Sequence, residues 1–169
     1  MLVAFGPMLG DVGVRPVQLP EDGDFLRSVY ASTREPELNV LGWSEAETAV
    51  FLRRQFDAQA RHLDTFFPHA TQSVVLAGNT PVGRLIVARS AEEIRIVDIA
   101  LLPAFRHLGL GSVLVQRLLE EADAKHLPVR CHVLQNNEAR RFWEHVGLVA
   151  QGLDGVHVAM ERACGTSPP

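Results

Sequence analysis

Short runs of apolar and β-branched residues recur along the chain, separated by longer stretches in which apolar residues keep helical spacing. The runs around Val74 and Val82 are joined by Gly78-Asn79-Thr80-Pro81, which is typical of a β-hairpin. The run that begins at Ile94 has apolar residues on both faces, as expected of a central strand. Strands are predicted at Val12–Leu19, Val74–Ala77, Val82–Val87, Ile94–Leu102, Pro128–Leu134, Leu148–Gln151 and Val156–Arg162.

The stretches with helical spacing carry recognisable start and stop signals. Pro20-Glu21-Asp22 predicts the start of a helix that runs to about Arg34. Glu35 to Trp43 is predicted as a loop because it holds proline, asparagine and glycine. Ser44-Glu45-Ala46-Glu47 is a capping box and predicts a long helix to about Leu63. The remaining helices are predicted at Gly109–Lys125 and, capped by Asn136-Asn137, through Val146 to a closing Gly147.

The order of these elements places an antiparallel meander before a strand, helix and strand crossover. That order predicts an α/β or α+β domain with one mixed sheet. No repeat or linker divides the 169 residues, so we expect a single domain with its core over about 12–162 and a flexible tail at 163–169.

Composition and charge narrow the classes of partner. The net charge is -4 and no basic block occurs, so nucleic acid is not an expected partner. Met1 to Gly10 is too short for a membrane span and lacks the features of a secretory signal, so we expect no membrane association and a cytoplasmic protein. Cys131 and Cys164 stand far apart, and the histidines show no ligand spacing, so no metal site is predicted.

The segment from Arg106 to Gly111 lies between a predicted strand and a predicted helix. A helix that begins after a glycine-bearing loop presents unpaired N–H groups and the positive end of its dipole, which together favour an anion such as pyrophosphate. Arg106 would add a planar, positively charged donor group. A turn that binds no ligand is the alternative for this string alone. A P-loop is excluded because no Gly-Lys-Ser/Thr ending follows.

Two pieces in this order resemble the GNAT superfamily of acyl-CoA-dependent N-acetyltransferases. They are Asp98-Ile99-Ala100-Leu101-Leu102-Pro103 leading into the Arg106 loop, and the helix from Asn136 that ends in Gly147-Leu148. The resemblance covers about Val12 to Arg162 and implies a mostly antiparallel twisted sheet flanked by about four helices. It also implies transfer of an acetyl group from acetyl-CoA to a primary amine within a ternary complex. A catalytically idle acyl-CoA-binding or regulatory domain is the alternative.

The resemblance also implies where the cofactor binds. The end of the central strand would hydrogen-bond the pantetheine arm, the loop main chain would hold the pyrophosphate, and Asn136 either reaches the cofactor or simply caps its helix. The cofactor-binding residues expected on this basis are Ile99, Ala100, Leu101, Arg106, His107, Leu108, Gly109, Leu110, Gly111, Ser112, Asn136 and Trp143.

The reaction requires a neutral amine, whereas a lysine-like amine with a pKa of about 10.4 is mostly protonated at neutral pH. A residue must therefore accept its proton, directly or through water. Asp98 is the first candidate for this base and Glu93 the second, and Arg84 or Arg95 is expected to pair with Asp98. A role for Asp98 in orienting the substrate or in structure is the alternative.

Three positions depart from the family pattern. His107 stands where glycine is frequent and Leu108 where a basic residue is frequent, so we expect a stiffer, less positive loop and weaker phosphate binding. Trp143 stands where many members have a tyrosine that protonates the departing thiolate, and an indole N–H cannot replace that acid. Trp143 would instead wall the cofactor channel or fill the core.

The acceptor site is expected between the first two helices, from Tyr30 to Trp43, and at the turn near Gly152. Glu35 or Glu37 would contact the amine there, and a solvated surface loop is the alternative for this mix of charges. An exposed Trp43 would favour a binding role over simple anchoring. The sequence leaves open whether the acceptor is a small molecule or a peptide. It also leaves open the oligomeric state, with a homodimer as one alternative.

Overall fold

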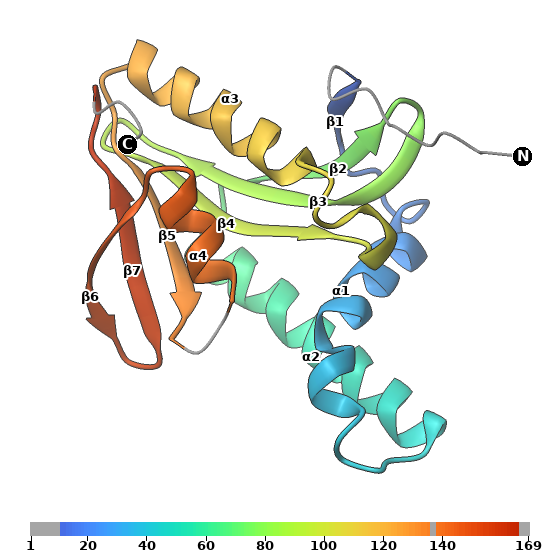
Figure 1. The fold of residues 1–169 in the computed structure, drawn as a ribbon. Helices are drawn as coiled ribbons and strands as arrows, with labels where there is room; N and C mark the ends of the chain where they lie inside the picture. Colours follow the sequence, from blue (N-terminus) through green and yellow to red (C-terminus); the bar gives the residue numbers. More distant parts are fainter. Residues whose placement is uncertain (1–10, 136–137, 166–169) are drawn as a thin grey trace, which may run out of the picture.

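A single sheet of seven strands in the order β1-β2-β3-β4-β5-β7-β6 runs through the computed structural model, which describes residues 11–135 and 138–165 (Figure 1). Only β4 and β5 pair in parallel, and every other neighbouring pair is antiparallel. This confirms the predicted mixed, mostly antiparallel sheet. The strands are β1 (Val12–Pro16), β2 (Thr71–Ala77), β3 (Thr80–Arg89), β4 (Ile94–Leu101), β5 (Val129–Leu134), β6 (Val149–Asp154) and β7 (His157–Arg162).

Helices cover both faces of the sheet (Figure 1). On one face, buried residues of α3 and α4 share a core with alternate residues of the central strands. On the other face, α1 contacts β3 and β4, and α2 lies against α1. None of the helices within the described residues is long and apolar enough to span a membrane. The helices are α1 (Gly23–Leu38), α2 (Glu45–Phe66), α3 (Leu110–Ala124) and α4 (Ala139–His145), with a short 3₁₀ turn η1 at Pro103–Phe105.

The central strand β4 contributes to both cores, as its apolar pattern predicted. Ile94 and Ile96 are buried in the core under α3, where they share the cluster with Leu114 and Leu118. On the opposite face, Ala100 of β4 is buried, and α1, whose Val29 is fully buried, contacts β4. Burial of each such side chain stabilises the fold by about 2 kcal/mol, so β4 is fixed from both sides. A site on this strand therefore rests on rigid support.

The capping box predicted for the second helix is confirmed. The Ser44 N–H donates to Glu47 Oε2 at 2.9 Å, and the Glu47 N–H donates to Ser44 Oγ at 3.3 Å. These bonds satisfy main-chain donors that the first turn of a helix leaves free. The helix then runs three residues beyond the predicted Leu63, to Phe66.

The prediction that the loop begins at Glu35 is wrong, because α1 continues to Leu38 through Pro36. Proline has no N–H and cannot bond the carbonyl of Ser32, four residues earlier. The guanidinium of Arg106 supplies that missing donor, with Nη2 3.1 Å from the Ser32 oxygen. Leu38 is also buried, so packing favours one more helical turn. A residue distant in sequence thus compensates for the proline.

Most strand boundaries differ from the predicted ones by a few residues, and β1 shows a clear cause. It ends at Pro16 rather than Leu19, because the Asp22 carboxylate accepts hydrogen bonds from the Gln18 N–H at 2.8 Å and from Arg15 at 2.7 Å. These bonds turn the chain away from the sheet. At the other end of the chain, the predicted turn at Gly152 to Gly155 is shorter, because β6 continues to Asp154 and β7 begins at His157.

Candidate functional site

The central strands separate near the middle of the sheet. β4 pairs with β5 only from Ile94 to Ile96, and β5 continues beside β7 as far as Leu134. A bulge at Val97, where Ile86 pairs with Asp98 and Val87 with Ile96, bends β4 at the point of separation. From Val97 onward, the β5-facing edge of β4 therefore has main-chain groups without a strand partner. An extended ligand can hydrogen-bond such an edge.

Gly83 of β3 allows the main chain of β4 to lie unusually close to β3 at the end of this open strand. It pairs with Leu101, and a Cβ at this position would lie 2.3 Å from the Ala100 carbonyl oxygen, which no side chain tolerates. The sequence analysis missed this residue. A glycine inside an otherwise β-branched strand was the available signal, since it often marks a close backbone approach.

The loop from Arg106 to the start of α3 leaves its main-chain donors free. No residue that the structure describes accepts a hydrogen bond from the consecutive N–H groups of 107–112. Gly109 is the N-cap of α3 with φ 81°, a left-handed conformation that glycine adopts readily. Free N–H groups at the N-terminus of a 15-residue helix, together with the positive end of its dipole, form an anion site.

The guanidinium of Arg106 is used within the protein and does not extend from this loop toward an anion. Its Nε donates to the Leu101 oxygen at 2.8 Å, and its Nη2 donates to the Ser32 oxygen and hydroxyl at 3.1 Å each. We expected the Arg106 guanidinium to add positive charge for a phosphate. In the structure, its Nε and Nη2 instead donate to groups of the protein. Arg106 instead fixes the loop to β4 and α1. The free groups belong to the main chain of the residues that follow it.

The side chains of this loop provide little positive charge. His107 is exposed and adopts φ 60°, which explains why glycine suits this position. Leu108 is 42% exposed and carries no charge. The anion site therefore depends on main-chain N–H groups rather than on cationic side chains.

Other predicted cofactor residues lie around the loop. A Cβ on Gly111 would lie 3.6 Å from the Phe142 ring and 4.0 Å from Ile99 Cδ1, so the start of α3 packs against both α4 and β4. Leu110 is buried and Ser112 half-buried. A groove of about 520 Å³ between α3 and α4 begins at Ser112 and is lined at its far side by His145 and Val146.

Trp143 is a core residue in this structure. It is 6% exposed, belongs to the core under α3, and meets Phe142 edge-on with ring centroids 5.0 Å apart. Of the alternatives for this tryptophan, the structure favours packing. Tyr30, the only tyrosine in the sequence, is also buried, and its ring packs against Phe56 of α2. Asn136 lies outside the described residues.

Asp98 lies on the other face of β4, toward α2. Its Oδ2 accepts a hydrogen bond from Arg84 Nε at 3.0 Å and forms an ion pair with Arg84 Nη2 at 2.8 Å. Arg84 is 3% exposed, and its Nη2 also donates to Gln59 Oε1 of α2 at 2.9 Å. The expected pairing of Asp98 with Arg84 is confirmed, and Arg95 bonds Glu93 instead. Gln59 is a partner that the sequence analysis missed.

One oxygen of Asp98 remains available. Among the described residues, none donates a hydrogen bond to Oδ1, and the side chain is 27% exposed. A buried guanidinium must be paired, so Arg84 holds the carboxylate in one orientation. The structure thus presents a fixed carboxylate oxygen on the face of β4 opposite α3, beside the opening between β4 and β5.

Glu93 has different surroundings. It precedes β4, and its oxygens accept from Arg95 Nε at 2.7 Å and from Arg130 Nη1 at 2.6 Å. Partial burial alone would raise the pKa of Glu93, but these hydrogen bonds outweigh it and hold the pKa below its usual value. At about 3.3 Å per residue, β4 separates Glu93 from Leu101 by roughly 25 Å. Glu93 is therefore not brought together with the loop.

The connection between α1 and α2 is exposed where an acceptor was expected. Trp43 is 43% exposed and meets Phe51 edge-on at 5.2 Å, and Val40 is 81% exposed. Of the two acidic candidates, Glu37 forms an ion pair with Arg34 at 3.1 Å, whereas Glu35 is exposed on α1.

Nothing in the described part of the chain groups His, Cys, Asp and Glu as metal ligands. Burial raises the pKa of the Cys131 thiol to about 12, so this residue is not a nucleophile at neutral pH. The arrangement therefore offers a main-chain anion site and a carboxylate on two faces of one strand.

Comparison with known proteins agrees with this geometry. A family model described as the acetyltransferase (GNAT) family matches residues 30–148. The PaiA N-acetyltransferase of Thermoplasma acidophilum, solved in complex with coenzyme A, has a TM-score of 0.68 at 17% identity, over 90% of this chain and 98% of that chain. A comparison with the curated proteins found no match.

Two further solved structures share the fold. A GNAT family acetyltransferase of Elizabethkingia anophelis with acetyl-CoA bound has a TM-score of 0.58 at 11% identity, over 90% of this chain and 98% of that chain. Ard1 of Thermoplasma volcanium has a TM-score of 0.56 at 22% identity, over 91% and 98%. At these identities the likeness shows the fold alone.

Proposed function

Because the chain belongs to the GNAT family of acetyltransferases, whose acyl donor is acetyl-CoA, we propose that it is an N-acetyltransferase acting on a primary amine. The observation that carries this proposal is the run of free N–H groups at 107–112, one short 3₁₀ turn after the open edge of β4. The family gives the reaction class, and these groups supply the phosphate-binding site that such a donor needs.

The residues around the loop fit acetyl-CoA, which supplies an acetyl thioester as the group to be transferred. In this proposal, the main chain of Ile99, Ala100 and Leu101 hydrogen-bonds the pantetheine arm, and the N–H groups of 107–112 hold the pyrophosphate. The groove that begins at Ser112 has room for the nucleotide end. Asn136 stays a candidate for a further polar contact. Trp143 lies in the core behind this site and supports it by packing.

Asp98 is the proposed proton acceptor. Arg84 holds its carboxylate through Oδ2 and leaves Oδ1 free on the face of β4 opposite α3, where an amine can approach the opening between the strands. Direct attack of that amine in a ternary complex needs one proton removed, and Asp98 accepts it directly or through a water. Glu93 is the weaker candidate because both of its oxygens are paired with arginines and it lies at the far end of β4.

The acceptor side fits a small or peptide-borne amine that reaches in from the α1–α2 connection. Trp43 offers an exposed aromatic surface and Glu35 an exposed carboxylate on this side. No tyrosine is available to protonate the leaving thiolate. A thiol with a pKa near 8.5 leaves tolerably as the thiolate, so the reaction proceeds with water as the final proton donor.

The proposal is tested by titrating the protein with acetyl-CoA in a calorimeter and then measuring free thiol released with a panel of amines. We expect saturable binding and amine-dependent release that is lost when Asp98 is replaced by Asn. Tight binding without release on any amine would indicate an idle acyl-CoA-binding domain. Absence of binding at millimolar acetyl-CoA would overturn the proposal.

A further inference from the structure

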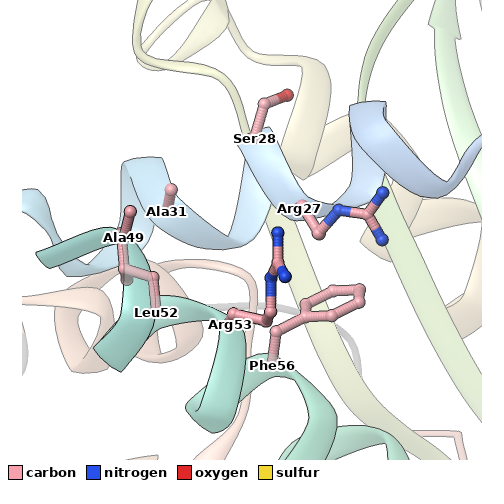
Figure 2. A pocket seen from close by; sticks show the side chains of 7 residues that line it. All are labelled: Arg27, Ser28, Ala31, Ala49, Leu52, Arg53 and Phe56. Atoms are coloured by element: carbon pink, nitrogen blue, oxygen red, sulfur yellow. The ribbon is translucent and has the colours of Figure 1, made fainter. Parts of the chain in front are cut away.

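A groove lies between α1 and α2, and none of its lining residues is assigned a role in the acetyl-transfer reaction. It has a volume of about 280 Å³ and lies where α1 and α2 pack side by side (Figure 2). Figure 2 shows the groove with two chemically different ends. Ala31, Ala49 and Leu52 lie at one end, and Arg27, Arg53 and Phe56 at the other.

The apolar end is shaped by small residues on both helices. Ala31 and Ala49 leave space that a larger side chain would fill, and Leu52 adds an aliphatic surface. The ring of Phe56 is held edge-on against Tyr30, with centroids 5.7 Å apart and planes at 66°. Because Tyr30 is buried, the wall that Phe56 forms is fixed in place. This end suits an aliphatic side chain.

The other end of the groove is cationic. Figure 2 shows the guanidinium groups of Arg27 and Arg53 near the Phe56 ring. Arg27 donates one hydrogen bond to Asp24, and Arg53 has no partner among the residues that the structure describes. The Ser28 hydroxyl donates to the Phe25 oxygen at 2.7 Å, so it is not free to donate to a ligand. The remaining guanidinium donors match a carboxylate.

We propose that this groove docks a peptide segment of a partner protein that carries an Asp or Glu next to an aliphatic side chain. The charge of the two arginines complements the carboxylate, and the alanine-lined end receives the aliphatic group. A volume of about 280 Å³ holds a few side chains and lies just below the range of roughly 300–1,000 Å³ that encloses small molecules. The peptide backbone would therefore lie outside the groove, along the helix pair.

The binding should be modest and sensitive to salt. Both arginines are exposed, so a single ion pair with either contributes little. The contact gains strength from two guanidinium groups acting together with the aliphatic contact. Raising the salt concentration screens the charges over a Debye length of about 10 Å at 0.1 M.

The test measures binding of a fluorescein-labelled Gly-Ser-Leu-Glu-Leu-Glu-Gly-Ser peptide to the full chain by anisotropy, without acetyl-CoA. We expect saturable binding that Arg53→Gln weakens at least fivefold and that Arg27→Gln/Arg53→Gln abolishes. Ala49→Leu should also weaken it at least fivefold, because it fills the apolar end and leaves the charges unchanged. Arg54→Gln, at the exposed arginine next to Arg53 that does not line the groove, is the matched control and should stay within twofold.

Several outcomes would overturn the proposal. These are no saturation up to millimolar protein at low salt, equal effects of Arg53→Gln and Arg54→Gln, and unchanged binding in Ala49→Leu with its helix content intact. Equal binding of a peptide with Gln in place of Glu would remove the role of the carboxylate. Competition by free 4-methylpentanoate at the same concentration as the peptide would show a small-molecule site instead. Because acetyl-CoA is absent, the result is independent of the acetyltransferase proposal.

Discussion

The two faces of β4 form the two halves of the candidate site, and they are built from different parts of the chain. The cofactor half uses consecutive main-chain N–H groups at 107–112, while the Arg106 side chain is turned away and Leu108 carries no charge. The acceptor half uses side chains from three elements, with Asp98 from β4, Arg84 from β3 and Gln59 from α2. The first half should therefore respond to changes in backbone conformation, and the second to the loss of single polar atoms.

The largest expected effect is on the cofactor half. Gly109→Val places a β-branched residue at φ 81°, so the loop must change conformation and the N–H groups diverge. Losing two charge-assisted hydrogen bonds of about 1.5 kcal/mol each predicts acetyl-CoA binding weakened by about 100-fold, measured by calorimetry.

Gly111→Ala is the matched control for this change. Its Cβ would be in ordinary contact with Phe142 at 3.6 Å, and its φ is not left-handed. We expect its affinity for acetyl-CoA to stay within about threefold, a change of less than 0.7 kcal/mol. If Gly109→Val also bound normally, the loop N–H groups would not form the anion site.

The second-largest expected effect is on the acceptor half and should change the rate without changing cofactor binding. Asp98→Asn keeps the size of the side chain but removes the proton acceptor, so kcat/KM should fall by about 100-fold at neutral pH while acetyl-CoA affinity is unchanged. The loss should be greatest at low pH, because at high pH the free amine is abundant without a base. Glu93→Gln is the control and should keep most of the rate. An equal loss at every pH would assign Asp98 to orientation or structure instead.

A smaller effect tests how Asp98 is held. Gln59→Leu removes the acceptor of the Arg84 Nη2 bond, worth about 1 kcal/mol, and should lower kcat by about fivefold without changing acetyl-CoA affinity. The side chain of Gln55, one turn earlier on α2, has no hydrogen-bond partner among the described residues, so Gln55→Leu serves as the control. A shift in thermal stability with an unchanged kcat and pH profile would reduce Gln59 to a structural residue.

The cofactor half could be predicted from the sequence more fully than the acceptor half. The strand, glycine loop and helix of the cofactor half follow one another along the chain, so hydrophobic spacing and turn residues were sufficient to predict them. The capping box at Ser44 is also a local signal and was confirmed. Side-chain direction was not predictable in the same way. Arg106 lies in the loop, yet its guanidinium bonds Ser32, which is distant in sequence.

The acceptor half depends on contacts that no local pattern encodes. Gln59 lies 25 residues from Arg84, and nothing in an amphipathic helix distinguishes it from its neighbours. The extension of α1 through Pro36 has the same origin, because a donor from another element compensates for the missing N–H. The glycine inside the β-branched run at Gly83 was a local signal, but the atom that excludes a side chain there, the Ala100 oxygen, is brought near only when β3 and β4 pair.

Adding charge to the loop should sharpen the contrast between the halves. Leu108→Arg places a cation on an exposed side chain beside the free N–H groups. An exposed ionic contact contributes about 0.5 to 1 kcal/mol, so acetyl-CoA affinity should rise by about threefold, and less at high salt. Leu108→Gln is the uncharged control. Equal affinity for both variants would place the phosphates away from Leu108.

The smallest expected effect asks whether the imidazole of His107 matters at all. His107 adopts φ 60°, which costs an L-residue about 1 kcal/mol, and glycine would relieve part of this strain. His107→Gly should therefore raise Tm by about 1–2 °C. His126, after α3, has φ 55° and is the matched control, so His126→Gly should stabilise the fold similarly.

The two variants, His107→Gly and His126→Gly, make the same change, but only His107 lies in the loop. If main-chain N–H groups alone hold the anion, His107→Gly leaves acetyl-CoA affinity within about twofold of the parent at every pH, as His126→Gly does, because a left-handed glycine preserves the direction of the N–H groups. An affinity that falls in His107→Gly only at acid pH would instead show that a protonated imidazole contributes charge. That result would make the cofactor half, like the acceptor half, dependent on a side chain.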